Sequence, residues 1–258
     1  MKSFMQVILL ISLLSGCKTD DTPKLSATLE KPIAMNVYCQ GTPDQLLRRI
    51  EYEYDRGNLV TETTLVNGEE DIKQTYAYDS KNLLVKLIIE TSLTKVVKTY
   101  EYNGLNQLTN VIHTTFHYDV SGAIVNENTV ETPMEYENGQ LVKEWKTWGG
   151  YTTYAYKNNK VTTMTEYTVY GTQHHITKYK YSGDLKIEER TETATGTLLH
   201  LKTFQYDGEN RLVTILDGED IVEENIYEEN KLKEKRTFYF GIDPGFDICY
   251  GNYIYRYE

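Results

Sequence analysis

The stretch YEYDRGNLV, residues 52–60, decides the fold of this chain. Its two tyrosines, Tyr52 and Tyr54, are two positions apart, and side chains at that spacing lie on one face of a β-strand. Asp55 and Gly57 form turns readily, and Leu59 then resumes the apolar pattern. The stretch therefore predicts a tight β-hairpin that carries aromatic rings on one face.

The same pattern recurs ten times along the chain. Each copy ends its first strand in a tyrosine, which we call the anchor tyrosine, and nine of the ten anchors have a large apolar residue two positions before them. An aliphatic residue returns four to six positions after the first nine. This recurrence predicts an antiparallel meander of about ten β-hairpins. The anchors are Tyr54, Tyr78, Tyr102, Tyr118, Tyr136, Tyr156, Tyr181, Tyr206, Tyr227 and Tyr255.

Three of these copies, YEYDRGNLV at 52–60, YAYDSKNLLV at 76–85 and FQYDGENRLV at 204–213, resemble the YD-repeat (Rhs-type) family. The resemblance covers nearly everything after residue 45. It implies a long strip of hairpins that coils into a curved shell, which in some large family members encloses a C-terminal toxin. Because the last anchor lies close to Glu258, we expect a short form without a toxin domain.

We expect residues 32–258 to form one all-β domain of YD-like hairpins. The tyrosine stripe forms its core, because the repeat has little else to bury. The residues between paired aromatics are mostly polar, as Glu53 and Lys180 are, which disfavours a transmembrane barrel with its apolar outer band. The strip must still hide one face, as a curved sheet, a barrel-like shell or a flattened sandwich, and the sequence favours none of these.

The amino terminus has the pattern of an export signal. Residues 1–16 contain a basic start and an apolar stretch too short to span a bilayer. Leu14-Ser15-Gly16-Cys17 resembles the lipobox of bacterial lipoproteins, which implies a lipid on Cys17. An ordinary secretory signal is the alternative. Residues 17–31 are polar and predict a flexible tether.

The acidic part of this tether resembles the sorting stretch of some surface lipoproteins of Gram-negative bacteria. We therefore expect an outer-membrane protein that is lipid-anchored and faces the cell surface, with a periplasm-facing protein as the alternative. Loss of residues 1–16 removes Lys2 and no acid, which moves the net charge from -11 to about -12. A surface with this charge disfavours nucleic-acid binding, so we expect membrane contact through the lipid alone.

We find no sequence motif for catalysis, a metal or a cofactor. The five histidines lack ligand spacing, and nucleophile elbows, phosphate loops and dinucleotide fingerprints do not occur. We therefore expect no enzyme activity and no cofactor. Cys39 and Cys249 are interpreted as two separate buried thiols, with a disulfide bond between them as the alternative. That bond would make the first and last strands neighbours.

The candidate binding patch is Trp148, Tyr151 and Tyr170. Trp148 lies next to a Gly-Gly tip, and Tyr170 lies in the following connection at the same end of the meander. The two rings could form a stacking platform for a glycan or a protein partner, or they could fold over the core. We expect a binding or adhesion module. The alternatives are a purely structural envelope lipoprotein and a remnant of an Rhs-type toxin shell.

Overall fold

The computed structural model describes residues 31–39, 42–238 and 253–258. These residues form eighteen β-strands and no helix. The strands are β1 (Ala34–Cys39), β2 (Thr42–Asp55), β3 (Asn58–Val66), β4 (Glu69–Tyr78), β5 (Leu84–Glu90), β6 (Thr94–Tyr102), β7 (Leu108–Tyr118), β8 (Ile124–Glu137), β9 (Gln140–Trp145), β10 (Tyr151–Lys157), β11 (Lys160–Tyr167), β12 (Gln173–Ser182), β13 (Leu185–Thr193), β14 (Leu198–Tyr206), β15 (Leu212–Asp217), β16 (Asp220–Glu228), β17 (Lys231–Thr237) and β18 (Tyr253–Tyr257).

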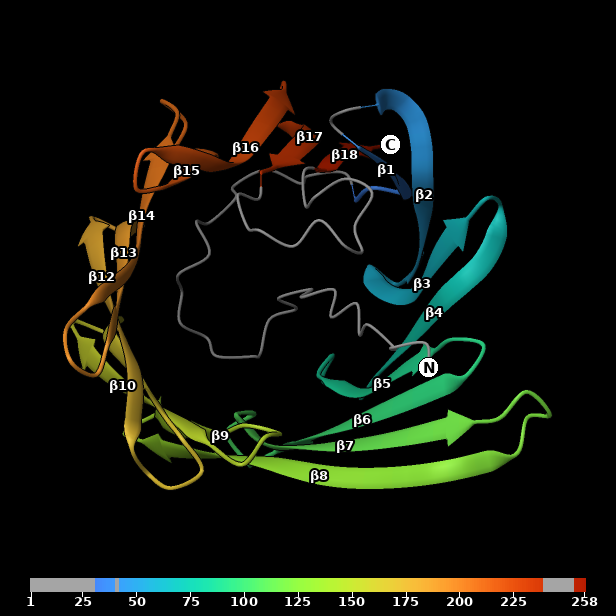
Figure 1. Ribbon diagram of the computed structural model, residues 1–258, viewed down its shortest axis with the longest axis horizontal. Helices are drawn as coiled ribbons and strands as arrows, with labels where there is room; N and C mark the ends of the chain where they lie inside the picture. The colour runs from blue at the N-terminus through green and yellow to red at the C-terminus, as the bar shows by residue number, and fades with distance from the viewer. Residues whose placement is uncertain (1–30, 40–41, 239–252) are drawn as a thin grey trace.

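The strands form a closed antiparallel barrel. Each strand pairs with its neighbours in sequence, and β1 pairs with β18, with Cys39 opposite Tyr253. Figure 1 shows the resulting ring of strands viewed end-on. Closure leaves no sheet edge at the two chain ends, which removes the exposed backbone groups of an open meander. The structure therefore selects the barrel-like shell among the three expected architectures.

The barrel has two chemically different rims. One rim, which we call the tyrosine rim, holds the turns that follow the anchor tyrosines, from 56–57 to 229–230. The opposite rim, the loop rim, holds the connections between hairpins, such as 146–150 and 168–172. Successive connections alternate between the two rims, and eight turns lie at the tyrosine rim.

Three turns of the tyrosine rim are closed by the side chain of the residue after the anchor. In one of them the Asp79 carboxylate accepts hydrogen bonds from the N–H groups of Lys81 and Leu83, at 2.8 and 2.9 Å. Asn103 and Asp207 act in the same way. The third residue after Asp79, Asn82, has a φ of 66°, a positive value that asparagine adopts readily. This explains why an Asp or Asn so often follows the anchor.

The anchor tyrosines also tie each hairpin to the one before it. Opposite every anchor up to Tyr227 the partner strand contains a β-bulge. At six of these bulges a carbonyl accepts a hydrogen bond from the hydroxyl of the next anchor. The Tyr78 hydroxyl, for example, donates to the Leu59 carbonyl at 3.0 Å, and Leu59 is paired with Tyr54. The same link recurs at Tyr102, Tyr156, Tyr181, Tyr206 and Tyr227.

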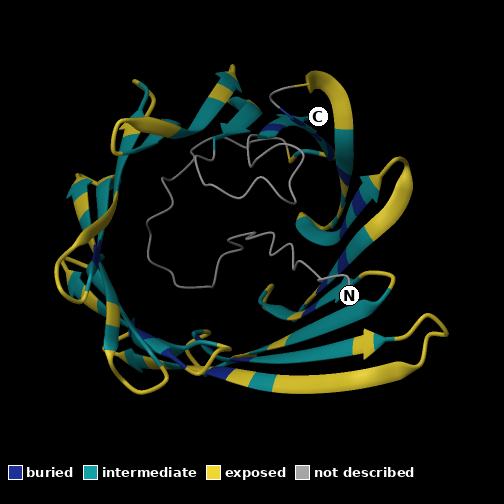
Figure 2. Cartoon of the chain, viewed as in Figure 1, coloured by how far each residue is buried: buried dark blue, intermediate teal, exposed yellow. Residues whose placement is uncertain are grey.

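The tyrosine-bearing face of the sheet is the less exposed one. Figure 2 shows the buried residues within the strands and the exposed ones in the turns and along much of β8. The tyrosine-bearing face carries most of the buried residues, whereas residues between paired aromatics, such as Glu53 and Lys180, are exposed. Side chains converge on the inside of a barrel and diverge on the outside, so this difference assigns the tyrosine face to the inner wall. Toward the loop rim the same wall becomes polar, with buried Glu62, Gln74 and Thr152.

One anchor does not follow the expected arrangement. Tyr118 ends β7 at the loop rim, whereas the other nine lie at the tyrosine rim. The turn after it has the same chemistry, since Asp119 accepts from the N–H groups of Ser121 and Ala123. Because the motif specifies a turn and not a rim, it also serves at the end of the longer β7–β8 hairpin. The described strands thus form eight hairpins with a turn at the tyrosine rim, and the expected number of about ten hairpins is not confirmed.

Several sequence predictions lie outside the described residues. The signal at 1–16, the lipidated Cys17, nearly all of the tether 17–31 and Cys249 belong to this group. Cys39 is disulfide-bonded, so its interpretation as a free thiol is wrong, while its pairing with Cys249 stays a prediction. In the described part of the chain, no helix is long and apolar enough to cross a membrane.

Candidate binding surface at the loop rim

Exposed large apolar side chains gather at the loop rim. At the tyrosine-rim end of the strands the exposed ones are Leu105 (77%), Ile33 (67%), Ile226 (41%) and Ile187 (38%). The loop rim exposes many more, from several connections around the ring. They are Leu46, Val66, Val120, Ile124, Val125, Trp148, Val169, Tyr170, Leu198, Leu199 and Ile221. Large apolar residues concentrated on one surface are typical of an interaction site.

Two neighbouring loops hold the aromatic residues of this rim. The β9–β10 loop is closed by bonds from Lys146 N–H to the Gly150 carbonyl and from Gly149 N–H to the Lys146 carbonyl, at 2.8 and 2.9 Å. The β11–β12 loop is closed in the same way between Thr168 and Thr172. The Thr168 hydroxyl also accepts from the N–H of Tyr170 at 3.3 Å. Both loops are therefore short and internally bonded.

Two glycines let the loops and rings approach closely. A Cβ at Gly150 would lie 1.8 Å from the Trp148 ring and 2.4 Å from the Tyr167 carbonyl oxygen. Gly149 has a φ of +89°, and a Cβ there would meet Val169 at 3.1 Å. Trp148 therefore folds over the backbone of its own loop, which in turn contacts the β11–β12 loop.

Beside the loops lies a stack of side chains from β9, β10 and β11. The Tyr151 and Tyr167 rings stack with centroids 4.6 Å apart, and Trp145 is tilted against Tyr151 at 6.4 Å. The Lys143 ammonium lies 3.9 Å from the Trp145 ring centroid and 4.4 Å from that of Tyr151. By strand alternation this stack lies on the outer face. Stacking and cation–π contacts of this kind fix the position of the rings.

The structure brings the three predicted patch residues onto adjacent strands and loops. Trp148 is 55% exposed and Tyr170 is 91% exposed. Tyr151 is half-buried in the stack, and its hydroxyl would lie 4.0 Å from a Cβ at Gly171 in the second loop. Lys143, Trp145 and Tyr167 lie outside the patch predicted from the sequence. Trp145 and Tyr167 are paired with Tyr151 on the two neighbouring strands, which is visible only once the register is known.

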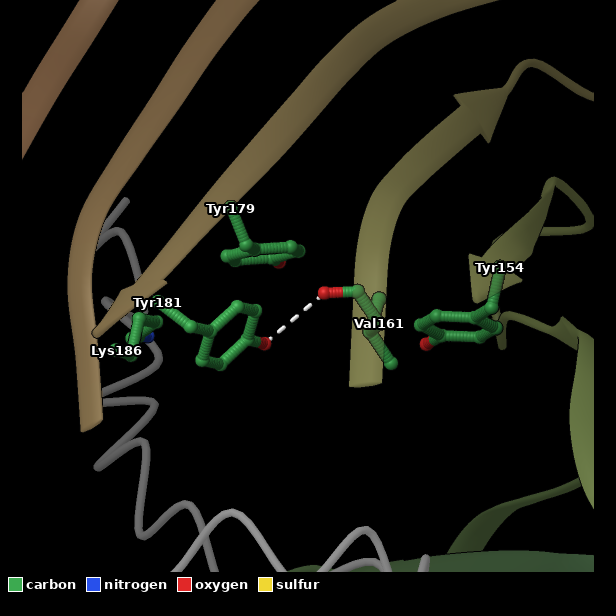
Figure 3. A pocket seen from close by; sticks show the side chains of 5 residues that line it. All are labelled: Tyr154, Val161, Tyr179, Tyr181 and Lys186. Atoms are coloured by element: carbon green, nitrogen blue, oxygen red, sulfur yellow. Dashed lines mark hydrogen bonds between the residues drawn. The ribbon is translucent and has the colours of Figure 1, made fainter. Parts of the chain in front are cut away.

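A second concave surface lies on the inner wall between β10, β11 and β12. It has a volume of about 240 Å³ and is lined by Tyr154, Val161, Tyr179, Tyr181 and Lys186 (Figure 3). Tyr181 uses its hydroxyl for the link to Val161, and Lys186 forms an ion pair with Glu189 at 2.9 Å. These polar groups therefore already have partners within the sheet, and the pocket repeats the packing of the anchor tyrosines.

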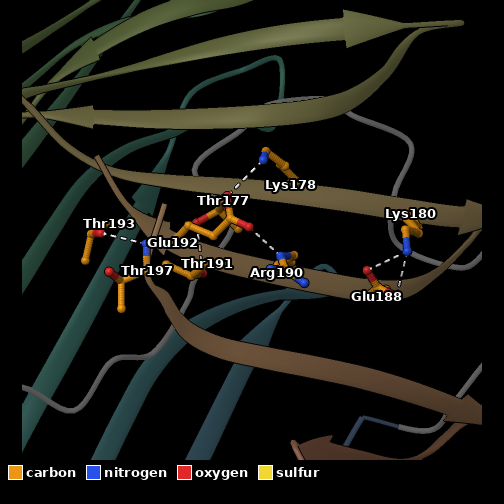
Figure 4. A network of polar contacts seen from close by, with 9 residues as sticks. All are labelled: Thr177, Lys178, Lys180, Glu188, Arg190, Thr191, Glu192, Thr193 and Thr197. Atoms are coloured by element: carbon orange, nitrogen blue, oxygen red, sulfur yellow. Dashed lines mark hydrogen bonds and ion pairs between the residues drawn. The ribbon is translucent and has the colours of Figure 1, made fainter. Parts of the chain in front are cut away.

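The outer face is charged away from the stack. On β12 and β13, Lys178 and Arg190 pair with Glu192 at 2.9 and 2.5 Å, and Lys180 pairs with Glu188 at 2.8 Å (Figure 4). Lys178 and then Arg190 hold the pKa of Glu192 below its ordinary value. Exposed pairs of this kind contribute little stability. They do make this part of the outer wall hydrophilic.

The polar part of the inner wall contains partly buried ionisable groups. Burial, and then the neighbouring Lys98, lower the pKa of His113 to about 4, so the imidazole is neutral at pH 7. Burial raises the pKa of Glu62, and a 2.6 Å hydrogen bond from Gln74 opposes that shift. Within the described ranges, no three His, Cys, Asp or Glu side chains cluster as a metal site would require. These groups line the wall without forming a recognisable catalytic arrangement.

Comparison with known proteins gives structural likeness only. No family model matches the chain, and no curated protein sequence matches it. A porin-like protein from Bacteroides uniformis is similar over 72% of this chain and 94% of its own, with 12% identity and a TM-score of 0.41. The crystal structure of TcdB2-TccC3-Cdc42 is similar over 74% of this chain, with 11% identity and a TM-score of 0.25. This chain spans 15% of that protein's chain.

Proposed function

We propose that the protein is a lipid-anchored binding module of the outer membrane, whose ligand site is the aromatic platform of the loop rim. The platform consists of Trp148, Tyr170 and the stack of Trp145, Tyr151 and Tyr167. The observation that supports the proposal most strongly is that Tyr170 is 91% exposed on a loop that is closed by its own hydrogen bonds. A large ring held in water costs solvation and contributes no packing, which is typical of a binding residue.

The ligand would meet flat aromatic surfaces and one cation. Aromatic rings bind the apolar faces of sugar rings and the side chains of proteins, and Lys143 adds a positive charge beside the rings. The chain as a whole is acidic, with a net charge of -11. We therefore propose a glycan or a protein as the ligand, and no nucleic acid.

The lipid on Cys17 would place the tyrosine rim nearer the membrane. The first described residues enter the barrel at that rim, where the Pro32 carbonyl accepts from the Tyr54 hydroxyl at 3.2 Å. The platform lies at the other end of the strands. An anchored barrel would thus present the platform to the exterior of the cell, with the charged outer wall in water.

The test is capture of ligand by Trp148→Ala. Tagged full-length protein is cross-linked on intact cells and screened against a glycan panel, and each variant is compared with the parent by thermal unfolding. We expect Trp148→Ala to lower capture at least tenfold while Tm stays within about 2 °C, because an exposed ring contributes little to stability.

Leu105→Ala is the matched control, because it removes an exposed apolar side chain at the tyrosine rim. We expect it to leave capture unchanged. Equal loss in both variants would indicate non-specific adhesion. If the parent captured no ligand saturably, a purely structural envelope protein would replace this proposal.

A further inference from the structure

One strand of the closed barrel has an unpaired edge along most of its length. β8 pairs with β7 from Ile124 to Pro133, but it pairs with β9 only from Met134 to Glu137. The last pair between β8 and β9 is Met134 with Glu144, and β9 ends one residue later, at Trp145. Among the described strands, none pairs with the other side of residues 124–133. Eight of those ten residues are exposed.

The sequence of this segment fits an edge. Pro133 has no N–H and is tolerated in a sheet only where that group would face away from the neighbouring strand. Pro133 is paired with Asn110 of β7. Because a proline there cannot donate to β7, we place its backbone nitrogen and carbonyl on the unpaired side of β8. By alternation, the N–H and carbonyl groups of Glu131, Thr129 and Glu127 face the same side. They form a ready template for another extended chain.

The charge of the edge favours one kind of occupant. Glu127 and Glu131 lie on the outer face, and none of the ion pairs formed by the described residues includes either of them. If two copies of β8 paired about Thr129, Glu127 would lie opposite Glu131, and like charges in that position are destabilising. A strand with basic residues at alternate positions would instead form two opposite-charge pairs.

We infer that the β8 edge is a second binding site, which accepts an extended segment of a partner protein with basic side chains at alternate positions. The segment adds to the barrel wall as one more antiparallel strand, and main-chain hydrogen bonds to residues 127–131 hold it. One end of the added strand would lie beside the β9–β10 loop, because β9 ends opposite the start of the edge. The site uses different residues from the aromatic platform and does not depend on it.

Hydrogen exchange of the full chain with a defined peptide tests this inference. The probe is a peptide of about ten residues that alternates lysine and threonine, and a glutamate-threonine peptide is the control. We expect the lysine peptide to protect the open-side amides of Glu127, Thr129 and Glu131 saturably. The glutamate peptide should give no protection there.

Two variants separate the contributions of backbone and charge. Thr129→Pro removes one N–H on the open side and should abolish protection by the peptide, while the amides of Asn126 and Thr132, which face β7 by alternation, stay protected. Glu127→Lys with Glu131→Lys should weaken the lysine peptide at least tenfold and transfer binding to the glutamate peptide. Trp148→Ala should leave the protection unchanged, which separates this site from the platform.

Three results would overturn the inference. The first is the absence of saturable protection at residues 124–133 in the parent. The second is protection that survives Thr129→Pro together with an intact β7–β8 pairing. The third is protection that grows with protein concentration without peptide, because it would make a second copy of the chain the occupant.

Discussion

The two rims of the barrel are built from similar hairpin turns but differ in what they expose. At the tyrosine rim the turns are bonded to one another. The Asn58 amide donates to the Asn82 side chain at 2.8 Å, Lys81 donates to Asn106 at 3.1 Å, and Gln107 donates to the Gly139 carbonyl at 2.9 Å. The loop rim instead exposes large apolar side chains such as Val120, Trp148 and Tyr170. One rim stabilises the barrel, and the other is available to a ligand.

The largest effect should come from the buried ring of Tyr76, which is 5% exposed. We expect Tyr76→Ala to lower the free energy of unfolding by about 3–5 kcal/mol, as removal of a buried aromatic ring usually does. Denaturant unfolding of the parent and the variant measures this change. A loss under about 1 kcal/mol would mean that the tyrosine face is not the core.

Alkaline pH should act on the same face. Burial raises the pKa of Tyr100 and of Tyr257 to about 12, from an ordinary value of about 10. The unfolded chain releases these phenolic protons first, so the stability is present below pH 10 and is lost as the pH rises toward 12. Each such tyrosine contributes about 1.4 kcal/mol per pH unit in that window. Unfolding followed between pH 8 and about 12 should show this loss, and a flat profile would contradict it.

The hydroxyl links can be tested one atom at a time. Tyr78→Phe removes the bond to the Leu59 carbonyl and should cost about 1–2 kcal/mol, because the bulge carbonyl loses its partner. Tyr170→Phe removes a hydroxyl that is exposed at the loop rim and should cost close to nothing. If the two variants were equally stable, the links would not hold the hairpins together.

The turn residue after the anchor should matter somewhat less. Asp207 accepts from the N–H groups of Glu209 and Arg211, both at 2.9 Å, and its Oδ2 also accepts from the Arg211 side chain. We expect Asp207→Ala to lower the free energy of unfolding by about 1 kcal/mol. Asp207→Asn should retain most of the stability, because the Asn103 side chain accepts the equivalent backbone hydrogen bond in another turn. An Asn variant as unstable as the Ala variant would point to charge as the cause.

Substitutions at the loop rim should have the smallest effect on stability. We expect Tyr170→Ala to change the free energy of unfolding by less than about 0.5 kcal/mol, because its ring is 91% exposed. The same measurement on Tyr76→Ala provides the contrast. A large loss in Tyr170→Ala would show that the ring packs on the barrel and would weaken its assignment to ligand binding.

Much of the fold can be predicted from the sequence because each repeat contains the residues that define its own strands and turn. Tyr52 and Tyr54 share a face because their spacing matches the strand period, and Asp79 marks a turn because its carboxylate bonds the backbone. The loops of Trp148 and Tyr170 are neighbours because consecutive hairpins in a meander are adjacent. Each of these inferences depends on residues close in sequence.

The remaining features depend on register and closure, which local patterns do not encode. The pairing of Cys39 with Tyr253 joins strands from opposite ends of the chain. Tyr118 has the anchor motif but lies at the loop rim. The long strands β7 and β8 place this extra copy of the motif at the opposite end of their hairpin. The bond from Tyr78 to the Leu59 carbonyl depends on a bulge, and bulges follow from pairing across strands.

Site-specific photocross-linking tests the difference between the rims most directly. A photoreactive phenylalanine derivative replaces Tyr170 in one protein and Leu105 in another, and both are irradiated on intact cells. We expect saturable cross-linking of a ligand at position 170 and none above background at position 105. Cross-linking of the same ligand at both positions, or at position 105 alone, would contradict the assignment of binding to the loop rim.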